Sequence, residues 1–255
     1  MKRLILIFTL LLTTSLSAQN WLLLMGCGNT SDITDTVGLY ALLWDLDTQN
    51  WWTLEKVTKD ANNKVTSWTD SSGAYNNGLQ ADTSKSPTWS STGVLFDGVN
   101  DFVRATSSMD VPVTVYMVFR SVTYTNLDII MGGATSGVVV FRQYDTAPSL
   151  SIYAGVGLGD NDDLAVGDWG IATVIFNGAN SSLQINSGTP LTGNTGAETV
   201  LNGITVGSGQ DGTGNWSNIE VKEVITRVWN DSEAQQNLIR AYLNDKYSVY
   251  YPYGK

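Results

Sequence analysis

The side chains that could carry out acid–base chemistry in this chain are mainly carboxylates, because the sequence contains no histidine. The absence of histidine excludes Ser-His-Asp triads and imidazole metal sites. A retaining glycosidase needs two carboxyl groups about 5 Å apart, which a Glu-x-Asp-x-x-Glu pattern on one strand would supply. No such pattern occurs. Glu220 and Glu223 are separated by three positions, so on a strand we expect them to face opposite sides.

A polysaccharide lyase would instead need a tyrosine acid–base beside cations that neutralise a substrate carboxylate. The chain has 14 basic residues, without a visible cluster of them, against 24 acidic residues and a net charge of −10. A surface of this sign repels nucleic acids and anionic membranes. We therefore predict no catalytic residues, a protein that is not an enzyme, and no nucleic-acid partner.

Sugar binding is the other chemistry that the residues suggest, because it needs aromatic platforms beside polar groups. Several aromatic residues lie in polar or loop contexts, and two asparagines flank one of them. The predicted ligand-binding residues are Trp51, Trp52, Trp89, Tyr144, Asn215, Trp216 and Asn218. The alternative is that each aromatic residue fills an end of the fold and contacts no ligand.

The elements that must position these residues are mostly strands. Short β-rich runs alternate with clusters of Gly, Asn, Ser, Thr and Asp, which is the pattern of an antiparallel all-β fold. In residues 113–119 every second residue is apolar and shares one face. Near the end, apolar residues at helical spacing follow Asp231 and Ser232, either of which could cap a helix. This spacing predicts one amphipathic helix over residues 232–246.

The first residues have the pattern of an export signal. Residues 1–18 combine two basic residues with an apolar run and a small-residue end, which predicts a secretory signal peptide. Two alternatives stay open: a lipid on Cys27, or an uncleaved anchor over residues 4–25. The single cysteine excludes an intramolecular disulfide. We predict a secreted or cell-surface protein that meets a membrane only through such a lipid or anchor.

Three segments, in order, resemble the laminin G-like jelly-roll domains of bacterial surface and secreted proteins, which have a concanavalin A-like fold. They are a strand and Asn-rich loop at 65–78, a strand-turn-strand hairpin at 93–103, and the pair 219–225 and 241–247. The resemblance implies an all-β, two-sheet antiparallel jelly-roll sandwich with one short C-terminal helix. Residues 57–255 would form this domain, and residues 19–56 an N-terminal extension with the first strand.

The resemblance also implies one structural calcium ion, where the loop 70–78 meets the final strand. Asp70, Asn76 and Glu223, with loop carbonyls, would supply the oxygen ligands that calcium prefers. The alternative is a turn in which Asp70 caps the backbone and Glu223 is held by a hydrogen bond. A second acidic loop, residues 160–163, is interpreted as a solvated turn.

Together these features predict an exported, non-catalytic binding or adhesion module that recognises a glycan or a surface glycoconjugate. A bacteriophage virion protein, structural or receptor-binding and homo-oligomeric, is the alternative from a different class. A glycan hydrolase or lyase is the third hypothesis, because jelly rolls host all of these functions.

Mass spectrometry of the intact protein from its native source tests the predicted export. We expect a mass that begins at Gln19, or at an acylated Cys27. A mass that includes Met1 would contradict cleavage and would favour a virion component or a membrane-anchored assembly.

Overall fold

The computed structural model describes residues 38–135, 139–209 and 212–249. All elements discussed below belong to one compact unit, residues 43–255. The predicted signal peptide, Cys27 and the anchor stretch 4–25 lie outside the described residues. Within the described residues, every helix is too short or too polar to cross a membrane.

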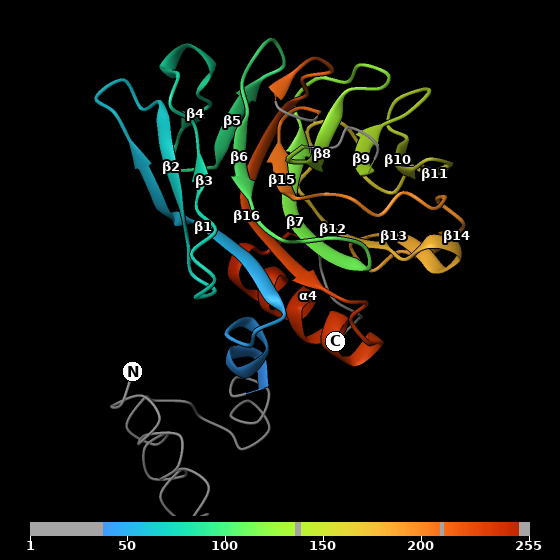
Figure 1. Cartoon of the computed structure of the whole chain (residues 1–255). Coiled ribbons are helices and arrows are strands. Elements are labelled where there is room, and N and C mark those ends of the chain that lie inside the picture. Colours follow the sequence, from blue (N-terminus) through green and yellow to red (C-terminus); the bar gives the residue numbers. More distant parts are fainter. Residues whose placement is uncertain (1–37, 136–138, 210–211, 250–255) are drawn as a thin grey trace, which may run out of the picture. The chain divides into compact units, whose positions relative to one another are not determined.

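Antiparallel strands dominate the fold, and one long helix, α4, follows the last strand (Figure 1). The strands are β1 (Thr48–Lys59), β2 (Val65–Asp70), β3 (Gly78–Leu79), β4 (Thr88–Trp89), β5 (Val94–Asp97), β6 (Val103–Thr106), β7 (Val113–Ser121), β8 (Ile129–Gly133), β9 (Val139–Gln143), β10 (Leu150–Ala154), β11 (Gly157–Asn161), β12 (Gly170–Phe176), β13 (Ser181–Ile185), β14 (Leu191–Gly193), β15 (Gly203–Val206) and β16 (Asn218–Val228). The helices are η1 (Thr83–Lys85), η2 (Gly178–Asn180) and α4 (Glu233–Tyr247).

These strands form one continuous sheet, so the predicted two-sheet jelly-roll sandwich is wrong. The hydrogen-bonded path runs β11-β10-β9-β8-β15-β6-β3-β2-β1-β16-β7-β12-β13-β14. Its two ends meet, because the side chain of Leu158 in β11 lies against Gly193 in β14. The result is a nearly closed, barrel-like sheet. The predicted all-β class and the C-terminal helix are confirmed.

Strand β1 is the physical reason for this correction. Its first half pairs with β16, through residues such as Trp52 opposite Val224. Its second half pairs with β2, and the register shifts between Trp52 and Val57. β1 therefore has a hydrogen-bonded partner strand on each side, at the place where the two sheets of a sandwich would be separate. The predicted domain start at residue 57 lies inside this strand.

The apolar core lies on the concave side of the sheet. In β7 the alternating side chains Val113, Val115, Met117 and Phe119 all belong to it, as their spacing predicted. Trp52 and Trp68 stack in the same core, with ring centroids 5.8 Å apart. Fully burying a side chain of this size contributes about 1.5–3 kcal/mol, so the core is the main source of stability.

Helix α4 covers part of the opposite, convex face of the sheet, where it packs on β7 and β12 (Figure 1). Ser232 is the N-cap, and a capping box with Gln235 satisfies free backbone donors of the first turn. Ile239 and Leu243 point toward the sheet and are buried. Their burial fixes which face of the helix meets the strands.

A bulge in β16 changes the expected direction of two acidic side chains. Glu220 pairs with Arg120, but Glu223 pairs with Val118, because the register shifts between Val221 and Glu223. Arg120 and Val118 are two positions apart on β7 and therefore share a face. Glu220 and Glu223 consequently lie on the same convex face, and the expectation that they face opposite sides is wrong. A bulge inserts one extra residue, which the spacing of the sequence does not reveal.

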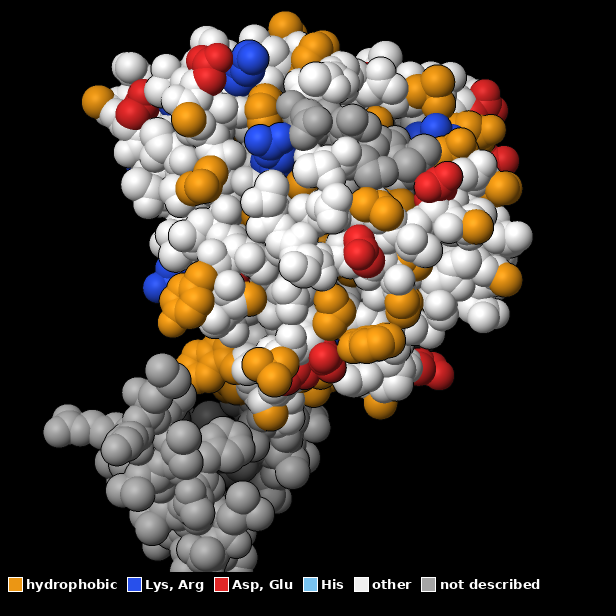
Figure 2. Space-filling view, viewed as in Figure 1, with side chains coloured by type: hydrophobic (Ala, Val, Ile, Leu, Met, Phe, Trp, Pro, Cys, Tyr) orange, Lys and Arg blue, Asp and Glu red, His pale blue; other side chains and the backbone are white. Residues whose placement is uncertain are grey.

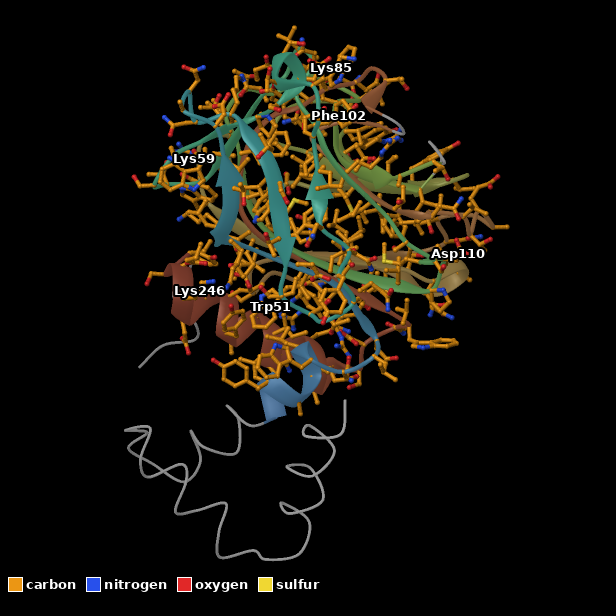
Figure 3. The ribbon with its side chains drawn as sticks, turned by 60° about the vertical axis from the view of Figure 1, so that its left-hand side comes forward. Trp51, Lys59, Lys85, Phe102, Asp110 and Lys246 are labelled. Atoms are coloured by element: carbon orange, nitrogen blue, oxygen red, sulfur yellow. The ribbon has the colours of Figure 1, made fainter. Side chains whose placement is uncertain are left out.

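The Glu223 carboxylate fastens the C-terminal end of α4 to the sheet. One oxygen accepts hydrogen bonds from Trp51 Nε1 at 2.7 Å and Tyr242 Oη at 2.9 Å. The other accepts from Lys246 Nζ at 2.8 Å and Tyr247 Oη at 2.7 Å. Figure 3 shows Lys246 on the helix and Trp51 next to it. Burial, followed by the negative charge of Glu223, raises the pKa of Tyr242 and of Tyr247 well above the usual range.

We predict that Glu223→Gln lowers the free energy of unfolding by about 2–4 kcal/mol. The side-chain NH₂ group of glutamine would face donors that need a hydrogen-bond acceptor. The Lys246 ammonium would also lose its buried anionic partner. Urea denaturation measures the change.

Glu55→Gln is the matched control, because Glu55 contacts the same lysine at 3.2 Å from an exposed position. Its expected cost is below about 1 kcal/mol. Equal losses in the two variants would contradict the anchoring role of Glu223.

Candidate functional site

Three cavities on the described surface differ in the chemistry that they could perform. The largest, about 760 Å³, lies between α4 and β13–β14, and is lined mainly by hydroxyl, amide and acidic groups and by Arg240, without an aromatic ring. Its acidic residues Glu233 and Asp245 are twelve positions apart on the helix, which separates their backbones by about 18 Å. The second, about 430 Å³ near Tyr75 and Phe102, contains no carboxylate.

The third cavity, here called the Trp169 cavity, holds two carboxylates, an indole and an amine. Its volume is about 370 Å³, within the range of about 300–1,000 Å³ that is usual for ligand sites. It lies on the convex face of the sheet, beyond the C-terminal end of α4. Its lining residues are Asp163, Leu164, Asp168, Trp169, Asn186, Lys222, Tyr247, Ser248 and Val249.

The loop between β11 and β12 supplies both carboxylates. Leu164 anchors this loop in the core, because its side chain packs against Gly170 at a distance that a larger residue would not permit. Gly167 donates a backbone hydrogen bond to the Ser121 carbonyl at 2.8 Å, with φ of +95°. Asp163 and Asp168 flank these two anchors, so the loop holds both acids at one cavity.

The Trp169 ring is fixed by neighbours on β7 and β16 and by Gly93, which precedes β5. Arg120 lies with its guanidinium carbon 5.1 Å from the ring centroid, and Lys222 with its ammonium 4.0 Å from it. Gly93 leaves room for the indole, since a Cβ carbon there would lie 3.1 Å from the ring. Arg120 is itself held by Glu220, at 2.6 Å. A ring held by such contacts is preorganised for stacking.

The opposite wall comes from the end of α4 and the end of β13. Tyr247 is held by its hydrogen bond to Glu223, and Ser248 closes the helix with a left-handed φ of 51°. Asn186 accepts a hydrogen bond from the Ile171 amide at 2.8 Å. Partial burial is the first cause that lowers the pKa of Lys222, and the nearby Arg120 charge acts in the same direction.

This combination of groups suits a carbohydrate. An indole offers a flat apolar face for a sugar ring, while carboxylate, amide and ammonium groups accept from and donate to its hydroxyl groups. Hydrolysis of a glycosidic bond also uses a pair of carboxyl groups, and two carboxyl groups line this cavity. None of Asp163, Asp168 and Trp169 was predicted as a site residue. The signal in the sequence was an acidic loop that ends in a tryptophan before a strand.

Two of the predicted sugar-binding residues are buried instead. Trp51 donates to Glu223 and meets the ring of Tyr242 edge-on, at 6.3 Å between centroids. Trp52 is fully buried in the core and donates to the Asn76 carbonyl at 2.9 Å. Both indoles therefore have structural partners, which is the alternative stated for them.

The remaining predicted residues lie at separate places. Trp89 is half-buried, and the Lys59 ammonium lies 3.6 Å from its ring centroid. Tyr144 follows β9, next to Arg142. Asn215, Trp216 and Asn218 lie together before and at the start of β16, where Asn215 donates to the Leu127 carbonyl at 3.1 Å. The structure thus does not gather the predicted ligand residues into one site, and their role in binding stays a prediction.

The predicted calcium ligands already have protein donors. The Asp70 carboxylate accepts from the backbone amides of Trp51, Ser72 and Asn76 and from the Ser72 hydroxyl, at 2.8–3.0 Å. The Asn76 side chain donates to the Gln49 carbonyl. Glu223 has the four donors given above. Among the described residues no group of three or more acidic or cysteine side chains could hold a metal ion. Calcium binding here stays a prediction, and these hydrogen bonds count against it.

Asp101 has a buried environment like that of a general acid, but it lies outside the three cavities. Burial, then the charge of Asp97, raises its pKa to about 6. One of its oxygens accepts from the Asp97 amide at 3.1 Å, and the other has no partner among the described residues. It is only 2% exposed and lines none of the three cavities described above. We therefore assign it to the hairpin between β5 and β6.

No protein-family model matches the chain. No curated protein sequence matches it either. Solved structures do resemble it. A Trypanosoma rangeli sialidase in complex with sialic acid aligns with a TM-score of 0.57 at 10% identity, over 84% of this chain and 38% of that chain.

Two further structures come from enzymes of arabinose-containing glycans. Domain 4 of AbnA, a GH43 extracellular arabinanase from Geobacillus stearothermophilus, in complex with arabinotriose, aligns with a TM-score of 0.51 at 13% identity, over 75% of this chain and 98% of that chain. A mutant GH54 α-L-arabinofuranosidase aligns with a TM-score of 0.52 at 15% identity, over 75% of this chain and 52% of that chain. Such likenesses establish a β-rich fold of glycan-related proteins, without a match to the laminin G-like family.

These neighbours contradict the prediction of a non-catalytic binding or adhesion module. All three are glycoside hydrolases or parts of them, so the fold is one that glycan-active enzymes contain. The prediction that the protein is not an enzyme rested on the missing Glu-x-Asp-x-x-Glu strand pattern. That reasoning was wrong because it placed both acids on one strand, whereas the loop holding Asp163 and Asp168 brings two acids to one cavity.

We predict that Asp101→Asn stabilises the protein at neutral pH. The folded-state pKa of about 6 exceeds the ordinary 3.8, so ionisation opposes folding. Asp101 therefore contributes most to stability below about pH 4, and this contribution is lost as the pH rises through about 6. The variant should be more stable by about 1–3 kcal/mol near pH 7, with little difference near pH 4. Urea denaturation of both proteins at the two pH values checks this, and a pH-independent difference would contradict it.

Proposed function

We propose that this protein is glycan-active and acts on a glycosidic bond at the Trp169 cavity. The observation that carries the proposal is the convergence of two carboxylates, Asp163 and Asp168, on a fixed indole. The likeness to glycoside hydrolases supports it at the level of the fold. This chain spans 38% of the sialidase, so the activity is argued from the cavity and not carried over from that enzyme.

The reaction would use the two carboxyl groups in different roles. One would donate a proton to the glycosidic oxygen as the C–O bond breaks, and the other would attack the anomeric carbon or activate a water. A separation of about 5–5.5 Å would give retention of configuration, and about 6.5–9.5 Å inversion. Trp169 would stack on the sugar ring, and Lys222 and Asn186 would bind its hydroxyl groups.

We also propose that the protein is exported. The support is the pattern of residues 1–18, a basic start followed by an apolar run and small residues. An extracellular location would bring the protein to polymeric glycans. A glycan is accordingly the partner that we propose.

Hydrolysis assays test the proposed activity. The full chain is incubated with arabino-oligosaccharides, and with sialyl-oligosaccharides as the negatively charged comparison, and released sugars are separated by chromatography. Asp163→Asn and Asp168→Asn should each lower kcat/KM by about 10²–10⁴-fold. Trp169→Ala should raise KM more than it lowers kcat, because it removes binding and not proton transfer.

Asp162→Asn is the matched control, because Asp162 is exposed in the same loop and does not line the cavity. It should retain wild-type rates. The absence of released sugar from every substrate, or full activity in both Asp163→Asn and Asp168→Asn, would overturn the proposal.

A further inference from the structure

A second group of functional side chains lies on the convex face of β9, β10 and β11, away from the Trp169 cavity. Arg142 in β9 pairs with Ser151 in β10, and Tyr153 pairs with Val140. Side chains two positions apart on a strand share a face. Arg142, Tyr144 and Tyr153 therefore point to the same side of the sheet, opposite to core residues such as Phe141 and Ile152.

Arg142 lies close to both tyrosine rings. Its guanidinium carbon is 5.1 Å from the ring centroid of Tyr144 and 4.9 Å from that of Tyr153. Its Nε donates to the Ser151 hydroxyl at 3.1 Å. A guanidinium packed on aromatic faces keeps its orientation, so its remaining donors point in fixed directions.

Glycines on strand β11 leave this surface open. Gly157 pairs with Tyr153, and a Cβ carbon there would lie 3.7 Å from Arg142 Nη2. A Cβ carbon at Gly159 would lie 2.9 Å from the Tyr144 ring. A Cβ carbon at Gly159 would therefore clash with the Tyr144 ring, whereas one at Gly157 would only touch Arg142. A longer side chain at either position would cover part of this surface. The glycines therefore keep the ring and the guanidinium accessible.

The charge of Arg142 is not balanced by an acid. In the described parts of the chain, no Asp or Glu forms an ion pair with it, and Nη1 and Nη2 have no hydrogen-bond acceptor. Two other arginines of this acidic protein do have such partners: Arg120 pairs with Glu220, and Arg227 with Asp45 and Asp231. Arg240 instead donates to the side-chain oxygens of Gln184 and Asn237. Partial burial lowers the pKa of Arg142, which is the expected effect of removing water without supplying an anion.

We propose that this surface is a binding site for a carboxylate-bearing saccharide, separate from the Trp169 cavity. The two terminal nitrogens of Arg142 would bind the sugar carboxylate in a bidentate manner, which is the geometry that a guanidinium favours. The tyrosine rings would stack on the apolar face of the pyranose. A saccharide fits better than an acidic peptide, because the two tyrosine rings beside Arg142 offer apolar faces on which a sugar ring can stack.

Isothermal titration calorimetry with defined probes tests this inference. The probes are tri-galacturonate and 3′-sialyllactose, each compared with its uncharged counterpart, the galacturonate methyl ester and lactose. The expected result is binding of at least one acid that is about 10- to 100-fold tighter than that of its counterpart. Addition of salt should weaken this binding.

Variants locate the binding. Arg142→Gln should remove the preference for the acid, and Arg142→Lys should restore it only in part, because lysine lacks the fork of donors. Lys85→Gln is the matched control: it removes one positive charge from an exposed residue on η1 and should leave the affinity unchanged. Thermal denaturation confirms that each variant is folded.

Three outcomes would overturn the inference: no binding of either acid at millimolar concentration, equal binding of the uncharged counterparts, or unchanged binding in Arg142→Gln. Glutarate that binds as tightly as tri-galacturonate would overturn the saccharide part, since it carries carboxylates without a sugar ring. Asp163→Asn and Asp168→Asn should not affect this binding. Failure here is therefore distinguishable from failure of the proposed hydrolysis.

Discussion

The buried carboxylate of Glu223 is the interaction on which the remaining structure depends most. It accepts hydrogen bonds from β1 through Trp51 and from three residues of α4, including Tyr247. An unpaired charge at such a position costs several kcal/mol, so the helix cannot leave the sheet without a large penalty. Because Tyr247 also lines the Trp169 cavity, the same carboxylate fixes one wall of the candidate site.

The bulge in β16 makes this arrangement possible. It places Glu220, Lys222 and Glu223 on the convex face, where regular alternation would have turned one of the acids into the core. Each acid then has its own cation, Arg120 for Glu220 and Lys246 for Glu223. Lys222 lies between these pairs and extends over Trp169. The inserted residue thus places Lys222, and through Glu223 also Tyr247, at the cavity, whereas the two carboxylates come from the loop between β11 and β12. Figure 2 shows one face of the molecule, on which charged side chains are scattered.

Local patterns predicted the parts of the fold that depend on local physics. The alternation of apolar residues predicted which side of β7 faces the core. The N-cap candidate and the helical spacing of apolar residues predicted each end of α4 to within one residue. The closure of the sheet depends on β1 pairing with two partners, and such long-range pairing leaves no local mark. Sequence patterns did not point to the Trp169 cavity for the same reason. Asp163 and Asp168 meet Lys222 and Tyr247 only after distant segments come together, whereas the conspicuous tryptophans Trp51 and Trp52 satisfied the needs of the core and the helix.

The distribution of cations separates the two proposed sites by the kind of ligand that each can accept. The net charge of −10 gives the protein a negative field that opposes any anion. At the Trp169 cavity two carboxylates strengthen that field locally, which favours an uncharged sugar ring. At Arg142 the rings of Tyr144 and Tyr153 stabilise the cation without neutralising it, so a single carboxylate gains a partner there. Each further negative charge on a polyanion would be repelled by the negative field of the protein. The second surface should therefore select a saccharide with one accessible acid group and an apolar ring face, because stacking must add to the attraction of one arginine.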